Sequence, residues 1–426
     1  MSPKVVYWMS RALRTHDNPA LYAAQQAALR LKAQLEINFF QVSTFPYANQ
    51  RNMDFLLRGL YEVAQTLEGL AIPVHVFTQK AHESLETRLQ TENIVLIVTE
   101  HAVLRPMLSL QKSVRSLCDE AWVDFMVVNT ACVVPVELAS PKLEYAARTF
   151  RPKIMSVYQT WLEKEYPIIS HPYNAPLTKT FSETELHALC LNFESIPPYK
   201  TELIPGEKAA LSQLEHFIQN GLDRYDRRNE VDAQSTSHLS AYLHFGMLAP
   251  TEMIRKVEAC HHPNGPLFVE EALVRRELAE NYCHYCKNYD SLDGAWRWAR
   301  LSLDQHRNDP RPYLYTLETF EQALTHDALW NACQRQVIDK GYLHGYLRMY
   351  WAKMVLLWTQ DPETALTILV YLNDTYFLDG RDPNGYTGIM WSIAGVHDRP
   401  WFNKPVNGLI RVMSRDGTLK KTKLKL

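Results

Sequence analysis

The first 130 residues alternate short apolar runs with stretches of helical periodicity, and this alternation limits the possible folds more than any other feature. The apolar runs are rich in β-branched and aromatic residues, as expected for strands buried on both faces. They are residues 5–8, 36–40, 74–77, 94–98 and 125–128. Between them, Leu56, Leu60, Val63 and Leu67 recur at helical spacing. The pattern predicts βαβ units, and hence a Rossmann-like parallel α/β domain over residues 1–130.

A change in the sequence pattern after residue 130 predicts a second domain. Residues 131–205 are predicted to be a connector, because six of the 40 positions from 166 to 205 are proline, a density that disfavours regular helix. From residue 206 onward helical spacing dominates, so we predict an all-helical domain over 206–426. Near its end, Asp416-Gly417 separates two apolar or alternating runs, which predicts a short terminal β-hairpin.

Composition excludes several classes of protein. Hydrophobic residues make up 46% and charged residues 22%, as in a globular protein rather than a disordered one. No run approaches the roughly 18 apolar residues of a membrane span, and the N-terminus does not resemble a signal peptide. Seven cysteines, an odd and small number, indicate free thiols in a reducing compartment. We therefore expect a cytoplasmic monomer with no membrane partner.

The sequence offers two short metal-like motifs, and we interpret neither as a site. Cys283 and Cys286 form one Cys-x-x-Cys pair without a second pair, whereas a structural zinc site needs about four ligands. Residues 260–262, Cys-His-His, also lack partners in sequence. The sequence therefore predicts no metal.

Charge and tryptophan content each leave two interpretations open. The net charge is only −2, but residues 399–426 contain eight Lys or Arg and one acid, a balance of +7. Such a segment is either a solvated tail or a nucleic-acid contact surface. Ten tryptophans in 426 residues indicate either a large aromatic core or a chemical role. The usual nucleotide fingerprints, Gly-x-Gly-x-x-Gly and the Walker sequence, are absent from the sequence.

Long motifs along the whole chain resemble the photolyase/cryptochrome family. They are YWMSR at 7–11, DNPAL at 17–21, YDRRN at 225–229, LSAYLHFG at 239–246, MYWAK at 349–353 and LDGRDPNGY at 378–386. The segments WSI at 391–393 and GVHDRPW at 395–401 resemble the class II cyclobutane pyrimidine dimer photolyases in particular. The resemblance implies an α/β antenna domain followed by a helical domain that binds folded FAD. It also implies light-dependent repair of dimers in DNA by electron transfer from reduced FAD.

The resemblance assigns nine residues to the flavin. They are Tyr225, Thr236, Ser237, His238, Leu239, Ser240, Arg348, Asn373 and Asp379. From residue type alone, the hydroxyls ahead of an apolar helical run suit either a pyrophosphate or a plain N-cap. The resemblance places Arg348 and Asp379 beside the isoalloxazine ring, where a guanidinium stabilises an anionic flavin. It places Asn373 at flavin N5, where an amide can turn to donate or accept, and Asn384 is the second candidate.

Three tryptophans are candidates for electron transfer. Trp351 and Trp358 are seven residues apart, which puts them on one face of a helix about 10 Å apart along its axis. On spacing alone a stripe of core residues is the better explanation. The resemblance matches Trp330, Trp351 and Trp358 to a chain that recharges the flavin, with Trp351 as the link between its flavin end and its surface end.

The resemblance also assigns the substrate side. Glu271 matches a carboxyl that hydrogen-bonds the dimer, and burial is expected to keep it partly protonated. Met349 and Trp391 match the walls of the lesion pocket. Arg399, Trp401 and Arg411 match the region that fills the gap left when the dimer leaves the duplex.

Other functions stay open at this point. A cryptochrome-like photoreceptor, a (6–4) photoproduct enzyme and a flavin electron carrier all share parts of the pattern. The α/β domain is expected to hold a deazaflavin, a folate or no antenna chromophore. DNA that contains pyrimidine dimers is the expected partner.

Overall fold

The computed structural model describes residues 2–41, 45–175 and 182–424. Its N-terminal part contains a five-stranded sheet in which every neighbouring pair is parallel. The strands are β1 (Lys4–Met9), β2 (Gln34–Phe40), β3 (Val74–Phe77), β4 (Ile94–Glu100) and β5 (Asp124–Val128). Their order is β3-β2-β1-β4-β5. All five predicted strands are confirmed.

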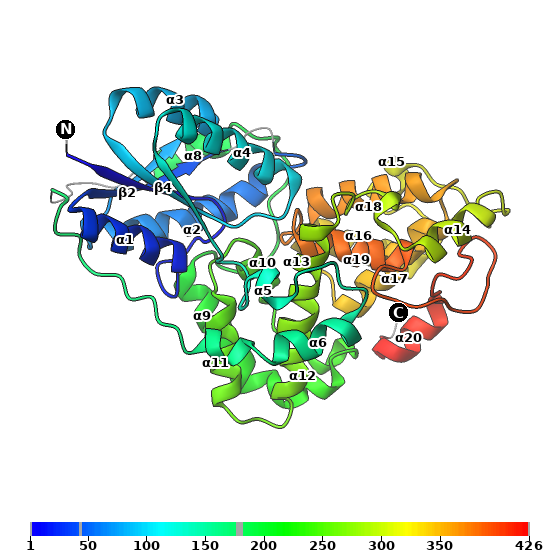
Figure 1. The fold of residues 1–426 in the computed structure, drawn as a ribbon. Coiled ribbons are helices and arrows are strands. Elements are labelled where there is room, and N and C mark those ends of the chain that lie inside the picture. The colour runs from blue at the N-terminus through cyan, green and yellow to red at the C-terminus, as the bar shows by residue number, and fades with distance from the viewer. Residues whose placement is uncertain (1, 42–44, 176–181, 425–426) are drawn as a thin grey trace.

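Side chains of β1 alternate between the two faces of the sheet, so both faces are buried. Val5 and Tyr7 belong to a core shared with helices α1 (Pro19–Leu31) and α2 (Gln50–Glu68). The residues between and beyond them, Val6 and Trp8, belong to a second core. That core is shared with helices α3 (Ala81–Thr91) and α4 (Arg105–Glu120), which lie on the opposite face of the sheet (Figure 1).

Strand β1 lies in the middle of the sheet and pairs with β2 on one side and β4 on the other. The chain adds β2 and β3 on one side of β1, and then β4 and β5 on the other. The helices after β1 and β4 therefore leave the sheet on opposite faces. A crevice forms at such a switch point, outside the carboxyl ends of the strands, and it is where ligands bind in open α/β sheets.

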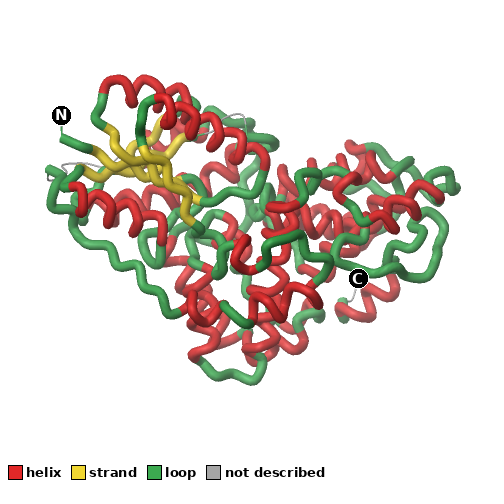
Figure 2. Tube along the Cα trace, in the orientation of Figure 1, coloured by secondary structure: helices red, strands yellow, loops and turns green. Residues whose placement is uncertain are grey.

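The rest of the chain is helical (Figure 2). Its longer helices are α9 (Glu207–Asn220), α11 (Pro250–Ala259), α13 (Arg276–Tyr285), α14 (Arg297–Gln305), α16 (Ala328–Lys340), α17 (Gly345–Leu357), α18 (Pro362–Tyr376) and α19 (Pro383–Ala394). Shorter ones are α10 (Ser240–His244), α12 (Gly265–Val269), α15 (Leu317–Glu321), 3₁₀ turns at Leu222–Arg227, Val231–Ala233 and Leu292–Gly294, and a π-helical segment at Glu270–Arg275. A separate apolar core holds α16 to α19 together. Within the described ranges, no helix combines the length and the apolar character needed to cross a bilayer.

The predicted connector contains four short helices. They are α5 (Val136–Ala139), α6 (Ala147–Met155), α7 (Tyr158–Leu162) and α8 (Glu183–Cys190). Helix α8 forms within the proline-rich part, in a stretch where the sequence between residues 177 and 196 has no proline. Helix α5 packs on α13, and α6 packs on the π-helical segment. The division at residues 130 and 205 stays a prediction.

The predicted terminal hairpin is wrong. Asp416 and Gly417 lie in the first turn of a helix, α20 (Arg415–Thr422), and not in a two-residue turn. The hydroxyl of Ser414 caps this helix by accepting a hydrogen bond from the Gly417 N–H at 3.1 Å. An Asp near the start and lysines near the end also suit the helix dipole. Helix α20 packs on α17, and that contact supports a helix that its sequence alone leaves ambiguous. Of the basic segment, Lys425 and Leu426 lie outside the described residues.

Candidate functional site

Three of the residues predicted to contact flavin meet in one hydrogen-bonded group, which we call the flavin cluster: Arg348, Asn373 and Asp379. Arg348 comes from α17, Asn373 from α18, and Asp379 from the turn after α18. The Arg348 guanidinium donates to both Asp379 carboxylate oxygens, at 3.0 and 3.2 Å, and to Asn373 Oδ1 at 2.5 Å. The same guanidinium stacks on the Phe377 ring at 3.9 Å. The cluster therefore presents a fixed, partly buried cation.

The Asn373 amide is held at both ends. Its Oδ1 accepts from Arg348, and its Nδ2 donates to Asp374 Oδ1 at 2.7 Å. Burial raises the pKa of Asp374, whose other carboxylate oxygen accepts from the Tyr386 hydroxyl at 2.7 Å. Both ends of the amide are therefore hydrogen-bonded to protein groups, and its predicted turning at flavin N5 stays a prediction. Asn384, the second candidate, is exposed and donates to Asp382 instead.

The predicted phosphate-binding residues lie in a short turn before α10. Leu239 occupies the N-cap position of α10 and makes no side-chain cap, so Ser240 stands at the first helical position. The Thr236 hydroxyl lies 3.1 Å from His238 Nε2, and His238 adopts a left-handed backbone with φ 55°. Among the described residues, the hydroxyls of Ser237 and Ser240 make no hydrogen bond, so the N-cap interpretation does not account for them.

Tyr225 is buried between aromatic rings. Its ring packs edge-on against Phe217 and Phe268, at 5.7 and 5.3 Å between centroids. Burial raises the pKa of its hydroxyl above the ordinary value. The Arg228 guanidinium lies 5.4 Å from the centre of the Tyr225 ring. The residue is therefore a neutral donor beside a cation.

The three predicted tryptophans form a continuous, buried stack, which we call the tryptophan triad: Trp330, Trp351 and Trp358. Trp330 is stacked on Trp351, with ring centres 6.3 Å apart and planes 7° apart. On its other side Trp330 meets Trp358 edge-on, also at 6.3 Å. Trp330, and not Trp351, is therefore the middle member. Trp351 lies at the end that contacts Phe377, the ring beneath Arg348.

The triad stops short of the surface, because Trp358 is only 3% exposed. Three residues that the sequence analysis missed continue the aromatic path. Tyr315 and His326 meet the Trp358 ring at 6.0 and 4.8 Å, and Tyr315 Oη lies 2.9 Å from His326 Nδ1. Tyr313 stacks on His326 and is 46% exposed. The path therefore reaches solvent through tyrosine and histidine, whose spacing in sequence gives no periodic signal.

Four predicted substrate residues, Trp391, Arg399, Trp401 and Arg411, meet in a second group that also contains Lys353 and Asp398, and we call this group the cation–tryptophan cluster. The Arg411 guanidinium lies over both indoles, 4.1 Å from the centre of Trp401 and 5.5 Å from that of Trp391. The Arg399 guanidinium lies 5.2 Å from the Trp401 ring. Cations over indoles, partly open to solvent, offer both charge and a stacking surface.

Lys353 and Asp398 belong to this group and were not assigned from sequence. Asp398 forms an ion pair with Arg411 at 3.0 Å and accepts from the Trp401 indole N–H at 3.3 Å. Lys353 Nζ donates to the Ser392 carbonyl at 2.7 Å and lies 4.7 Å from the Trp391 ring. Burial lowers the pKa of Lys353 to about 7, against the attraction of Asp398. The sequence feature that could have identified Lys353 is a charged residue within the otherwise apolar second half of α17.

Two other substrate predictions have different outcomes. Met349 stands four residues before Lys353, so the two side chains share one face of α17. Glu271 lies in the π-helical segment, but its side chain is 42% exposed and forms an ion pair with Arg228 at 3.3 Å. The expected burial of the Glu271 side chain is therefore not found in this structure. Its neighbour Glu270 pairs separately, with Arg151 and Arg275.

Comparison with known proteins identifies the family. The DNA photolyase family model matches residues 5–176. The deoxyribodipyrimidine photo-lyase of Potorous tridactylus is 41% identical over 99% of this chain and 80% of its own length. The chain belongs to the DNA photolyase family. The predicted resemblance is thereby confirmed at the level of the family.

Solved structures support the fold of this photolyase. A cryptochrome from Synechocystis superposes with a TM-score of 0.77 at 16% identity, covering 99% of this chain and 86% of the other. An archaeal photolyase from Sulfolobus tokodaii, solved with two FAD molecules, superposes with a TM-score of 0.72 at 17% identity. That match covers 99% of this chain and 87% of the other. At these identities the match confirms the two-part architecture alone.

A cavity in this photolyase lies at the switch point of the sheet. It opens beyond the carboxyl ends of β1, β2 and β4, with Trp8, Arg11, Phe40 and His101 among its lining residues. Phe245, next to α10, and Pro383, at the start of α19, line it from the helical part. The Arg11 guanidinium is fixed by Glu280 at 2.9 Å and Asp382 at 3.1 Å. The walls are therefore mainly apolar and aromatic, with a few anchored polar groups.

Proposed function

We propose that this protein uses light to split cyclobutane pyrimidine dimers in DNA, with reduced FAD as the electron donor. The observation that carries the proposal is that helix α17 contributes to all three groups of side chains. Arg348 belongs to the flavin cluster, Trp351 to the tryptophan triad, and Lys353 to the cation–tryptophan cluster. The donor, its supply of electrons and the substrate surface are thus linked by one rigid element.

The side chains present fit FAD. The flavin cluster offers a cation of fixed geometry, which suits an anionic ring. The hydroxyls of Thr236, Ser237 and Ser240 are groups that can donate hydrogen bonds to a phosphate. The buried Ser235 hydroxyl beside them has no hydrogen-bond partner among the described residues. A buried donor without a partner is costly, so it favours a bound acceptor. When bound, reduced FAD supplies the photoexcited electron that opens the cyclobutane ring.

The chain's own residues have three tasks in this function. Arg348, held by Asp379, stabilises negative charge next to Asn373. The tryptophan triad begins at Phe377, the ring on which Arg348 stacks, and runs toward the surface. It conducts electrons inward and so reduces the cofactor again after oxidation. The cation–tryptophan cluster holds the opened duplex, since indoles stack on bases and arginines contact phosphates. Glu271 and Met349 are assigned to the dimer itself.

The cavity at the switch point is assigned to an antenna chromophore of the deazaflavin or folate class. Trp8, Phe39 and Phe40 provide aromatic walls for a flat ring system, and Arg11 provides an anchored cation. Titration of each compound class into the purified protein, followed by fluorescence transfer to FAD, tests this assignment. If neither class binds, the cavity has no antenna role.

One assay tests the main proposal. The reduced protein is illuminated with dimer-containing DNA, and recovery of thymine absorbance is followed. Photolyase activity predicts recovery that requires both light and reduction. A protein that photoreduces FAD but leaves the dimers intact would be a cryptochrome-like photoreceptor, the second candidate, which the fold alone also permits.

A further inference from the structure

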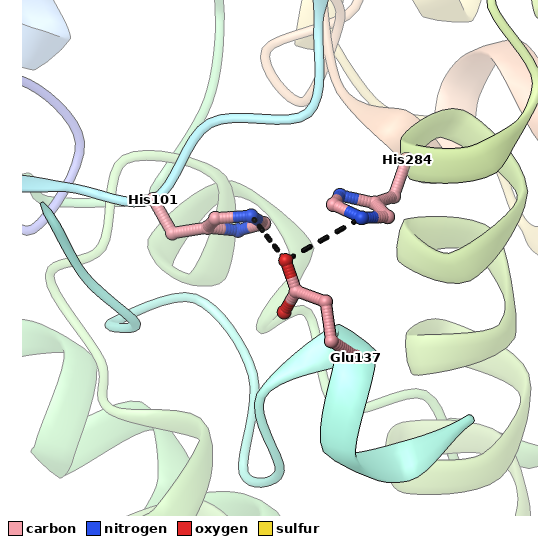
Figure 3. Close-up of side chains that lie close together, drawn as sticks. All are labelled: His101, Glu137 and His284. Carbon is pink, nitrogen blue, oxygen red and sulfur yellow. Dashed lines mark ion pairs between the residues drawn. The ribbon is translucent and has the colours of Figure 1, made fainter. Parts of the chain in front are cut away.

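Three potential metal ligands converge where the α/β part meets the helical part. His101 follows β4, Glu137 lies in α5, and His284 lies near the end of α13. Figure 3 shows the two imidazoles and the carboxylate pointing at a common space. His101 Nε2 lies 3.6 Å from Glu137 Oε1, and His284 Nε2 lies 3.4 Å from the same oxygen. All three ligand atoms lie within 4.8 Å of one another.

These separations match the edges of a metal coordination sphere. Zinc binds His nitrogen at about 2.0–2.1 Å and carboxylate oxygen at about 2.0–2.2 Å. Two ligands of a tetrahedron with such bonds lie about 3.4 Å apart, which is close to both His–Glu separations. Ordinary hydrogen bonds between these groups are shorter, at about 2.7–2.9 Å. The trio is therefore spaced for an ion between its members rather than for direct hydrogen bonds.

The surroundings hold these groups in place. The backbone N–H of His101 donates to the backbone carbonyl of Val128 at 2.8 Å, and this bond fixes the residue at the end of β4 beside β5. The Tyr285 hydroxyl donates to the Ser140 carbonyl at 2.9 Å, which ties the end of α13 to the end of α5. The sites for the three ligands are thus set by contacts outside the trio.

The electrostatic setting also suits a cation. The Arg11 guanidinium is already paired with Glu280 and Asp382 and does not compete for Glu137. Glu137 is half exposed, which leaves an entry path and room for a water as fourth ligand.

We propose that His101, Glu137 and His284 bind one divalent transition-metal ion of the zinc type. Two imidazoles and one carboxylate favour Zn²⁺ or Co²⁺ over Mg²⁺, which prefers oxygen ligands. The ion joins the loop after β4, helix α5 and helix α13. Because His101 also lines the cavity at the switch point, the ion also fixes part of that wall. The sequence prediction of no metal rejected the Cys-x-x-Cys pair around His284, but the other two ligands come from distant segments.

The test is zinc binding by the full-length protein after chelator treatment and dialysis. Bound Zn²⁺ is counted by mass spectrometry, and its affinity is measured by calorimetry. We expect one ion per chain in the parent protein. Glu137→Gln and His284→Asn should each weaken binding by more than about tenfold, because even loss of an outer-shell partner costs roughly 10–100-fold. Mg²⁺ should not compete.

The matched control is His262→Asn. His262 faces a single carboxylate, Asp223, at 3.6 Å in a loop that also contains Cys260 and His261. This variant should bind Zn²⁺ like the parent. Zn²⁺ should also raise the melting temperature of the parent and of the control, but not of the two ligand variants. Equal binding in all four proteins, binding lost only in His262→Asn, or no binding in the parent would each overturn the proposal.

Discussion

Two groups of tryptophans in this photolyase differ in what surrounds them. The tryptophan triad is fully buried, and among the described residues no cation lies over any of its rings. Trp391 and Trp401 are half-buried and lie beneath Lys353, Arg399 and Arg411. The same side chain thus occurs in an uncharged stack and in a cationic surface.

The difference separates two uses of indole. A positive charge close to an indole disfavours its oxidation, since it repels the radical cation that results. The triad lacks such a charge and is in continuous ring contact, which suits electron transfer. In the cation–tryptophan cluster the charges favour phosphate and the rings favour bases. Substitutions in the two groups should therefore affect different measurements.

The largest expected effect is in the triad. Trp330→Phe should nearly abolish light-driven reduction of oxidised FAD, because Trp330 alone contacts both other members. Trp351→Phe should do the same, with FAD still bound. Repair after chemical reduction should persist. The measurement is bleaching of the oxidised flavin absorption under blue light.

The control for this prediction is Trp122→Phe, at a position that is 95% exposed. It should photoreduce like the parent. Photoreduction at the parent rate in Trp330→Phe would show that electrons bypass the triad, and the contrast between the two groups would lose its basis.

The next effect concerns charge in the cation–tryptophan cluster. Burial lowers the pKa of Lys353 to about 7 from its ordinary value of 10.5. Between these values the unfolded chain holds a proton that the folded chain releases, so this group makes stability rise as pH rises. Lys353→Met removes this dependence. From pH 7 to pH 9, the parent should gain roughly 2 kcal/mol of unfolding free energy relative to the variant.

Urea unfolding at several pH values measures this gain. The exposed Lys420 provides the control, since Lys420→Met should track the parent at each pH. A constant difference between parent and Lys353→Met across the range would mean that Lys353 stays charged in the folded protein.

The sequence predicted the elements more completely than their ends or contacts. All five strands followed from apolar runs, because a sheet buried on both faces leaves few other choices. The terminal helix was missed because Asp416-Gly417 suits a hairpin turn as well as a first helical turn, and the cap at Ser414 and packing on α17 decide between them. A local sequence pattern contains no information about the packing of one helix on another that is distant in the chain.

The site shows the same limit. The family resemblance found the members of the flavin cluster and the triad, and two of them, Trp351 and Asp379, lie inside the long motifs. It misassigned the middle tryptophan and the burial of Glu271, because both depend on three-dimensional neighbours such as Arg228. Asp374, Asp398 and Tyr315 went unassigned, because each acts through a partner that is set by the fold.

A smaller effect is expected at Glu271, which lies outside both groups. Glu271→Ala should lower the repair yield per absorbed photon several-fold, because the carboxyl is assigned to the dimer's charge. Its exposed pair with Arg228 predicts a stability change within about 1 kcal/mol. Flash-yield assays and DNA titrations measure the two parts. Strong loss of DNA affinity with an unchanged yield would make Glu271 a binding residue.

The smallest effects concern the grip on DNA. Extrusion of a dimer from duplex DNA breaks base stacking and base pairing, at a cost of a few kcal/mol. A single strand has no base pairs and little stacking to break, so this cost is small there. A side chain that fills the vacated gap therefore matters mainly in duplex. Arg399 is exposed beside Trp401, so Arg399→Ala should weaken duplex binding by about 1 kcal/mol more than single-strand binding.

Lys420 separates gap filling from simple attraction. It lies exposed on α20, where it can contact phosphates of either substrate. Lys420→Ala should weaken duplex and single-strand binding equally and flatten the salt dependence of both. Titrations of both substrates at two salt concentrations compare the variants, and neither variant should change photoreduction. Equal losses on both substrates for Arg399→Ala would reduce Arg399 to another phosphate contact, and the cation–tryptophan cluster would then attract DNA without opening it.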